Sequence, residues 1–163
     1  MGLELPGALE RLLNDLGFTW PEVDEQELFN VGGSWMGFGG TLGQHQQSAQ
    51  SAAQQVTSLN QGEAMDAFMK KWSGDNAPAK VLGDAGTGVQ LGGAALYLCA
   101  GLVLGLKINT IINLTILAFE IAQAIATAAP TFGASLAEIP VFKEVTNRFI
   151  NAIINEVVSA IMA

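Results

Sequence analysis

The sequence contains little of the chemistry that catalysis and metal binding require. It has a single cysteine and a single histidine, and only 13% of its 163 residues are charged. Cys99 on its own can form neither an internal disulfide nor a cysteine-based zinc site. A catalytic or metal site built on histidine would depend on His45 alone. We therefore predict that the protein is not an enzyme and has no catalytic residues, no metal site and no cofactor.

Positive charge is also scarce. Seven Lys and Arg stand against fifteen Asp and Glu, which gives a formal net charge of −8. Nucleic-acid binding needs clustered basic side chains, so we expect no nucleic-acid partner. The N-terminus, residues 1–6, lacks the basic start and the apolar run of a secretory signal peptide. A protein made in the cytoplasm with such an N-terminus is expected to reach the cell surface or the medium only by a route that does not use a signal peptide.

The residues that are present predict one all-α domain. Half of them are hydrophobic, and apolar residues recur three and four positions apart, which is the spacing of one helix face. We expect helices over residues 6–16, 24–59, 63–72, 79–129 and 139–163. Gly17 is expected to end the first helix, and Asp24 to cap the start of the second. The last helical pattern still runs at Ala163, which predicts that the natural protein continues beyond it.

The helix over residues 24–59 carries the clearest periodic pattern, in which steps of three and four alternate without a slip. The positions are Leu28, Val31, Trp35, Phe38, Leu42, His45, Ala49, Ala52, Val56 and Leu59. We call this row the seam. A heptad seam is expected of a long helix packed along another helix, so we predict that it is buried against residues 79–129. Any apolar surface left over is expected to bind a small helical partner. His45 is either an exposed or hydrogen-bonded position of the seam or a pH-sensitive one.

Six glycines interrupt the same helix, and each costs about 1 kcal/mol relative to alanine in a helix interior. They are Gly32, Gly33, Gly37, Gly39, Gly40 and Gly43. Gly33 and Gly37, and again Gly39 and Gly43, lie four positions apart and would let a second backbone come close. A hinge is the alternative. Close packing is favoured because the heptad pattern continues through this region.

The helix over residues 79–129 is apolar enough to raise the question of a membrane. Leu91–Leu106 has no charged residue, and residues 85–137 carry only Lys107 and Glu120. A spanning helix needs about 20 consecutive apolar residues, and this run is shorter, rich in glycine and ended by Lys107. A core helix of a soluble protein is the favoured interpretation, and membrane contact remains the alternative.

Two short motifs resemble the WXG family, the small helical-hairpin substrates of type VII (ESX) secretion. They are Trp35-Met36-Gly37 and Trp72-Ser73-Gly74. In that family the motif lies at the turn between two long helices. Here the turn is expected at residues 59–62, which include Gly62, and the helix that follows, with Phe68 and Trp72, looks like the start of the family's second helix. Leu59 then stands where the family has its tryptophan.

A closer resemblance covers nearly the whole chain. The Leu-Pro-x-x-Leu opening and the run from Leu16 to Glu25 look like the N-terminal WXG-like domain of actinobacterial polymorphic toxins, which is similar to the channel-annotated domain of a necrotising toxin. The resemblance implies an elongated helical bundle built on a long hairpin (24–129), with an N-terminal helix and turn (1–23) and a C-terminal helix (130–163). It also implies export by type VII secretion and a toxin domain further along the same chain. The partner that it implies is either a small helical protein of the WXG type or a component of the secretion machinery.

One feature of the exported family is missing from the sequence. Its tail signal is Tyr-x-x-x-Asp/Glu, but the only tyrosine is Tyr97, and Gly101 stands four residues later. We expect either that a partner supplies this signal or that the export machinery recognises this domain in a different way. Three functions remain open at this point: an export-targeting and partner-binding domain, a membrane-inserting or channel-forming domain, and a structural helical bundle with no export role.

Overall fold

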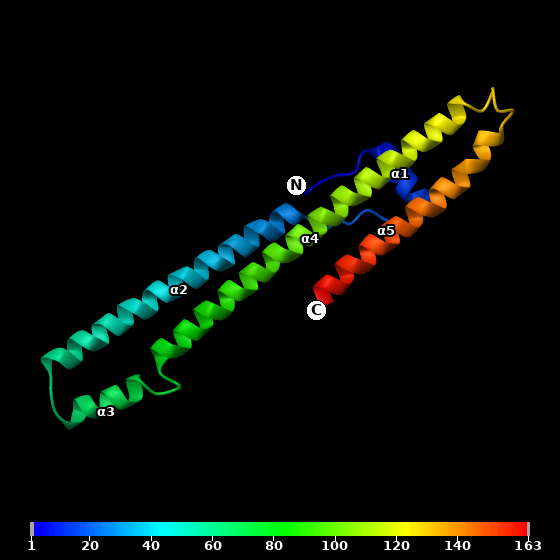
Figure 1. The fold of residues 1–163 in the computed structure, drawn as a ribbon. Coiled ribbons are helices and arrows are strands. Elements are labelled where there is room, and N and C mark those ends of the chain that lie inside the picture. The colour runs from blue at the N-terminus through cyan, green and yellow to red at the C-terminus, as the bar shows by residue number, and fades with distance from the viewer. Residues whose placement is uncertain (1, 163) are drawn as a thin grey trace. The chain divides into compact units, whose positions relative to one another are not determined.

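The protein is all-α, as its periodicity predicts. The computed structural model describes residues 2–162, and within this range there are helices and turns but no strand. The elements are α1 (Gly7–Asp15), α2 (Glu25–Leu59), α3 (Glu63–Trp72), α4 (Pro78–Ala126), a short 3-10 helix η1 (Ala134–Glu138) and α5 (Ile139–Met162) (Figure 1). The apolar region expected over residues 79–129 is one continuous helix.

Two of the predicted helix boundaries have the expected local cause. Gly17, just beyond α1, has a φ of +87°, a backbone conformation that glycine adopts without steric cost. At the start of α2, the Oδ1 atom of Asp24 accepts a hydrogen bond of 3.1 Å from the backbone amide of Glu27. This bond satisfies one of the free amides of the first helical turn. The pKa of Asp24 is lowered, first of all by this hydrogen bond to the charged form of its carboxyl.

The internal contacts of the chain fall into two compact units. The hairpin unit is Leu28–Leu98, and the terminal unit combines Met1–Glu27 with Cys99–Ala163. Both α2 and α4 contribute residues to each unit. The prediction of a single domain over residues 1–163, divided at 23 and 129, stays a prediction, and we describe the units one at a time.

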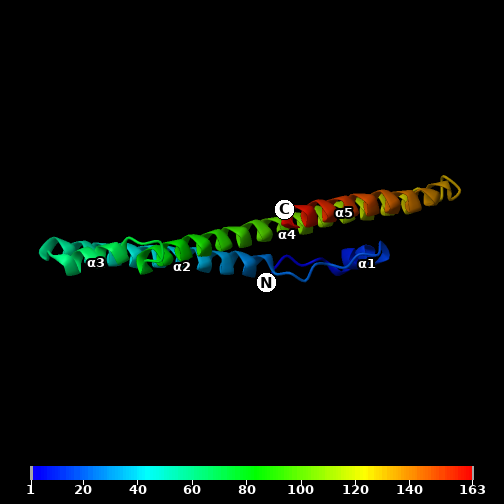
Figure 2. The ribbon, with the colours of Figure 1, turned by 90° about the horizontal axis from the view of Figure 1, so that it is seen from below.

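In the hairpin unit, α2 and the first half of α4 run side by side in opposite directions (Figures 1 and 2). The connection between them contains α3, so it is longer than the turn expected at residues 59–62. Small residues form the buried contact between the two long helices. They include Gly32, Gly39 and Ala53 on α2, and Ala79, Gly86 and Gly93 on α4.

In the terminal unit, α1, α5 and the second half of α4 enclose a small hydrophobic core. Leu13, Leu114 and Ile150 are buried at its centre, one from each helix. Leu9, Leu12 and Leu16, which the spacing of α1 placed on one face, pack around that centre. The side-chain amide of Asn147 on α5 donates a hydrogen bond of 2.8 Å to the Leu16 carbonyl at the end of α1. This bond gives the end of α1 a partner on α5.

Candidate functional site

Glycine backbones bring the two long helices of the hairpin unit into direct contact. A Cβ atom added to Gly39 would lie 2.8 Å from the carbonyl oxygen of Gly86, and one added to Gly93 would lie 2.8 Å from the carbonyl oxygen of Gly32. Real Cβ atoms do not approach a backbone oxygen this closely, so only glycine fits at these positions. The predicted close approach is confirmed at Gly39 and is wrong at Gly37 and Gly43, where an added Cβ atom would meet nothing within 4 Å. The alternative, a hinge, has no support, because α2 is helical from Glu25 to Leu59.

The prediction that the seam is buried against α4 is wrong. Trp35 is 48% exposed, Phe38 56% and Leu59 83%, and Val31 and Val56 are exposed as well. Leu28, Leu42 and Ala49 are half-buried, and Ala52 is exposed. The physical reason is the size of the seam side chains. The face of α2 that carries Gly32 and Gly39 lets the two helices approach more closely than the larger seam side chains could. The seam therefore lies along the flank of the contact and faces outward in the described part of the chain.

The apolar surface that the seam forms on α2 continues onto α4. The ring of Trp35 lies against Gly92, with ring carbons 3.2 Å from the position that a Cβ atom on Gly92 would take. Gly92 shares a face of α4 with Leu82, Val89 and Leu96, because these residues are spaced three and four apart. The side chains of Leu82, Val89 and Leu96 are half-buried. The flank of the hairpin unit is thus an apolar surface with contributions from both helices, and we call it the seam face.

The seam face contains no charged residue over most of its length. Residues 28–62 have no Asp, Glu, Lys or Arg. On α4 the hairpin unit has only Lys80 and Asp84, which lie 4.0 Å apart. His45 is exposed on α2. His45 is therefore not a buried position of the seam, and its role as a pH-sensitive position stays a prediction.

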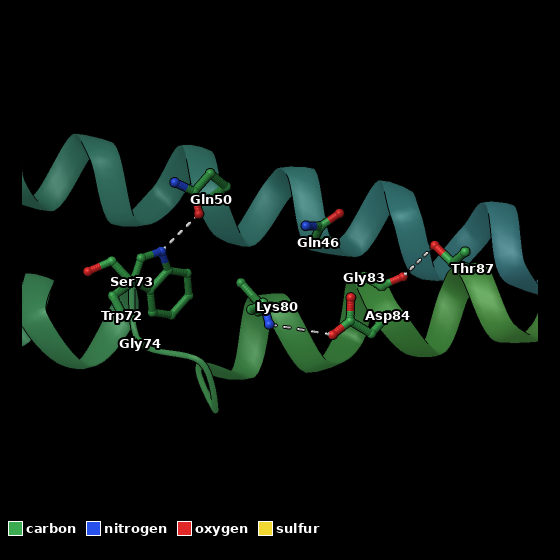
Figure 3. A pocket seen from close by; sticks show the side chains of 10 residues that line it. Gln46, Gln50, Trp72, Ser73, Gly74, Lys80, Gly83, Asp84 and Thr87 are labelled. Atoms are coloured by element: carbon green, nitrogen blue, oxygen red, sulfur yellow. Dashed lines mark hydrogen bonds and ion pairs between the residues drawn. The ribbon is translucent and has the colours of Figure 1, made fainter.

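The second Trp-x-Gly motif lies in the connection between the two long helices. Trp72 ends α3 and stacks on Phe68, with the ring centroids 5.7 Å apart. Its indole N–H donates a hydrogen bond of 2.9 Å to the Oε1 atom of Gln50 on α2. Gly74 follows in the link to α4 (Figure 3). Gly62 begins the connection, with a φ of +117° that favours glycine. Trp72-Ser73-Gly74, and not Trp35-Met36-Gly37, therefore lies in the connection between the two long helices, and the assignment of Leu59 to the place of the family's tryptophan stays a prediction.

An open polar groove of about 380 Å³ lies beside Trp72, lined by Gln46, Gln50, Ser73, Lys80, Asp84 and Thr87 among others (Figure 3). The Nζ atom of Lys80 lies 3.9 Å from Asp75 and 4.0 Å from Asp84. These charged side chains are mostly exposed, and their pairing contributes little to stability. The groove contains no arrangement of acid, base and nucleophile. Among residues 2–162, no cluster of three or more His, Cys, Asp or Glu side chains could hold a metal ion.

Tyr97, the only tyrosine, has a packing role in the hairpin unit. Its ring meets Phe29 edge to face, with the centroids 5.3 Å apart. A Cβ atom on Gly32 would lie 2.8 Å from the same ring. The tyrosine fills the space beside a glycine, which explains its presence without a role in a tail signal.

A buried ion pair holds the terminal unit together. The Nζ atom of Lys107 on α4 lies 2.7 Å from the Oε2 atom of Glu25, and both side chains are almost fully buried. The same Nζ donates a hydrogen bond of 2.7 Å to the carbonyl of Val23 and lies 5.7 Å from the centre of the Trp20 ring. The backbone amide of Leu3 donates to the other oxygen of Glu25. The pair therefore ties the N-terminal segment before α1, the loop before α2 and the middle of α4 to one another.

Burial by itself would raise the pKa of the Glu25 carboxyl, because it disfavours the charged form. The hydrogen bonds from Lys107 and from the Leu3 amide outweigh that effect, and the net result is a lowered pKa. Sequence reasoning did not find this pair. The available signal was Lys107 itself, because a lone lysine in an apolar helix needs a partner when it is buried.

The fold and these contacts define a class of protein: an α-helical domain built on a long glycine-packed hairpin with a Trp-x-Gly motif in its connection. Its sequence matches the family described as WXG100 like domain over residues 6–149. The chain belongs to this family. No curated protein and no solved structure matches it.

Membership places the chain in a helical family that is associated with type VII secretion and is not known for enzymatic activity. Domains of this family typically pair with partner proteins in secretion. The family suggests export by a system that does not read a signal peptide.

Proposed function

We propose that the chain is the export-targeting and partner-docking domain of a polymorphic toxin that leaves the cell by type VII secretion. The observation that supports the proposal is the seam face. A hairpin that buries glycine between its own helices and keeps Trp35, Phe38 and Leu59 exposed has an apolar surface ready for another helical protein. Large exposed apolar patches on soluble domains mark interaction sites. The chemistry of the toxin resides elsewhere, in a domain attached to the same chain.

The partner is a small helical hairpin of the same general kind. Its long helices lie along the seam face and complete a bundle of helices, with Trp35 and Phe38 as the central aromatic contacts. Aromatic side chains near the centre of an interface carry a large share of the binding free energy. Because the present chain lacks Tyr-x-x-x-Asp/Glu, the partner supplies that signal, and Trp72-Ser73-Gly74 presents the Trp-x-Gly element of the pair.

Replacing Trp35 by aspartate tests the proposal. Trp35→Asp places a charge within the seam face, where docking would bury it unpaired. We expect export of a toxin fused to the domain to fall at least tenfold, while the fused toxin keeps its activity inside the cell. Export is measured as the fraction of the fusion in the medium, with a cytoplasmic protein as the lysis marker.

The matched control is Leu91→Asp. Leu91 is 67% exposed on α4 and lies on a different face from Gly92 and Leu96, so it does not belong to the seam face. Both variants gain one negative charge and lose one exposed apolar side chain. Normal export of the Trp35 variant, or equal loss in both variants, would contradict the role of the seam face.

A second candidate function is membrane insertion. α4 is the one helix among the described residues that is long and apolar enough to cross a membrane, with a mean hydropathy of 1.8 over its best window. Only 22% of that window is buried in the structure, and a core helix of a soluble protein would bury more. Release of dye from liposomes at neutral and acidic pH tests this candidate. Retention of the dye at both pH values would count against insertion.

A further inference from the structure

The turn between α4 and α5 exposes an aromatic side chain in a strained conformation. Phe132 is completely exposed, and its φ is +50°. It is the one residue other than glycine with a positive φ among the described residues. This conformation is unfavourable for a bulky side chain. The backbone of Phe132 therefore costs folding free energy, and its fully exposed side chain gains no burial inside the domain that would offset this cost.

Several residues near Phe132 in the sequence are also apolar and exposed. Exposed apolar side chains flank it on α4, on η1 and on α5, namely Ile125, Leu136 and Val141. No Asp, Glu, Lys or Arg occurs between Glu120 and Glu138. We call residues 125–136 the tip. The tip is the end of the helix pair in the terminal unit (Figure 1), and it can leave water without burying a charge.

We propose that the tip is a lipid-anchoring loop that inserts Phe132 into the interface of a membrane with neutral headgroups. This function goes beyond export and docking, because it uses the terminal unit and not the seam face. It is also distinct from crossing the membrane. The tip enters the headgroup layer, and the charged Glu120 and Glu138 stay in water at its base.

Two observations favour lipid over a pocket on another protein. First, exposed apolar side chains occur on both sides of the turn, at Ile125 on α4 and Leu136 on η1, whereas a protein pocket is expected to contact a patch on one side. Lipid chains can contact a loop from every side. Second, the tip offers no charged group that could pair with a protein partner and fix its orientation. The net charge of −8 disfavours anionic lipids, so the expected target is zwitterionic.

Vesicle flotation with the purified chain tests the proposal. We expect the protein to float with phosphatidylcholine vesicles, and Phe132→Asp to weaken the partition at least tenfold, because one aromatic side chain leaves the interface and a charge enters it. Phe149→Asp is the matched control, since Phe149 is an exposed phenylalanine on α5 well away from the tip. It is expected to float like the unchanged chain, and trapped dye is expected to remain inside the vesicles.

The possible results separate this proposal from the others. Failure of the unchanged chain to float, or equal flotation of Phe132→Asp, overturns it. An equal loss in Phe132→Asp and Phe149→Asp also overturns it, because that result indicates general apolar adhesion. Release of trapped dye would mean that the helices cross the membrane, which likewise contradicts surface anchoring. Trp35→Asp should float normally, so a failure of the docking proposal leaves this one untouched.

A second measurement detects the strain directly. Phe132→Gly removes the side chain and relieves the positive φ. We expect this variant to unfold at a higher urea concentration than the unchanged chain while floating at least tenfold less well. A residue that served folding would give the opposite result, a lower midpoint. Stability and lipid binding should therefore move in opposite directions at this position.

Discussion

Replacing Lys107 by methionine should destabilise the fold by about 3 kcal/mol at neutral pH, because it leaves the Glu25 carboxylate buried without its cation. The two side chains are 3% and 6% exposed and 2.7 Å apart, so water cannot readily replace the lost partner. The double variant Glu25→Gln, Lys107→Met should recover most of the loss, since both charges are then absent. Urea unfolding of the three proteins measures the effect.

The exposed pair between Arg148 and Glu144 provides the control. Its Nε–Oε1 distance is 2.9 Å, but the side chains are 78% and 61% exposed. Arg148→Met should change the free energy of unfolding by less than about 0.5 kcal/mol. If Lys107→Met and Arg148→Met lost a similar amount of unfolding free energy, that result would contradict a special role for the buried pair.

The buried pair of Glu25 and Lys107 makes the free energy of unfolding depend on pH. The pKa of Glu25 is lowered in the folded state, so the pair contributes its full stability above the ordinary glutamate pKa of about 4.3. That contribution is lost as the pH falls through the lowered pKa of the folded state. In Lys107→Met the carboxyl is buried without a cation, and its pKa rises. We therefore expect this variant to become more stable between neutral pH and about pH 5, where the unchanged chain does not.

Two alanine substitutions on α2 should have opposite effects. Gly39→Ala should cost about 1–3 kcal/mol, because its methyl group would meet the Gly86 carbonyl oxygen at 2.8 Å and force the helices apart. A Cβ atom on Gly37 meets nothing within 4 Å. Gly37→Ala should therefore stabilise α2 by up to about 1 kcal/mol through helix propensity alone.

Urea midpoints of the two variants decide whether glycine is needed for close approach. Both variants carry the same substitution in the same helix, so a general effect of alanine cancels between them. Equal midpoints would show that the helices tolerate a methyl group at Gly39. A stabilised Gly39 variant would contradict the backbone contact between α2 and α4.

Much of the local structure could be predicted from the sequence. Gly17, Asp24 and the periodic leucines of α1 indicated where helices end, begin and bury a face, because capping and helix spacing depend on near neighbours. The helices over residues 24–59, 63–72 and 79–129 correspond to α2, α3 and α4 within a few residues. The family resemblance to WXG-like domains was also available, and the match over residues 6–149 bears it out.

The candidate site was less predictable. The heptad pattern correctly grouped Trp35, Phe38 and Leu42 on one side of α2, but it could not show that this side faces outward. The hydrogen bond between Trp72 and Gln50 joins residues 22 positions apart. Whether Trp72-Ser73-Gly74 lies between the two long helices depends on where the second of them begins. The connection proved longer than residues 59–62 because α3 lies within it.

The sequence by itself determined the all-α class and most of the helix boundaries, since these follow from composition and from interactions along one helix. Only the tertiary structure decided which face of α2 meets α4, which acid pairs with Lys107, and that Phe132 is left in water. The periodicity of a helix specifies which of its residues share a face. The distance to which α2 and α4 can approach each other decides which of those faces is buried between them. Backbone contact at Gly32, Gly39, Gly86 and Gly93 brought the helices nearer than the larger seam side chains would allow, and so left Trp35, Phe38 and Leu59 of the seam exposed.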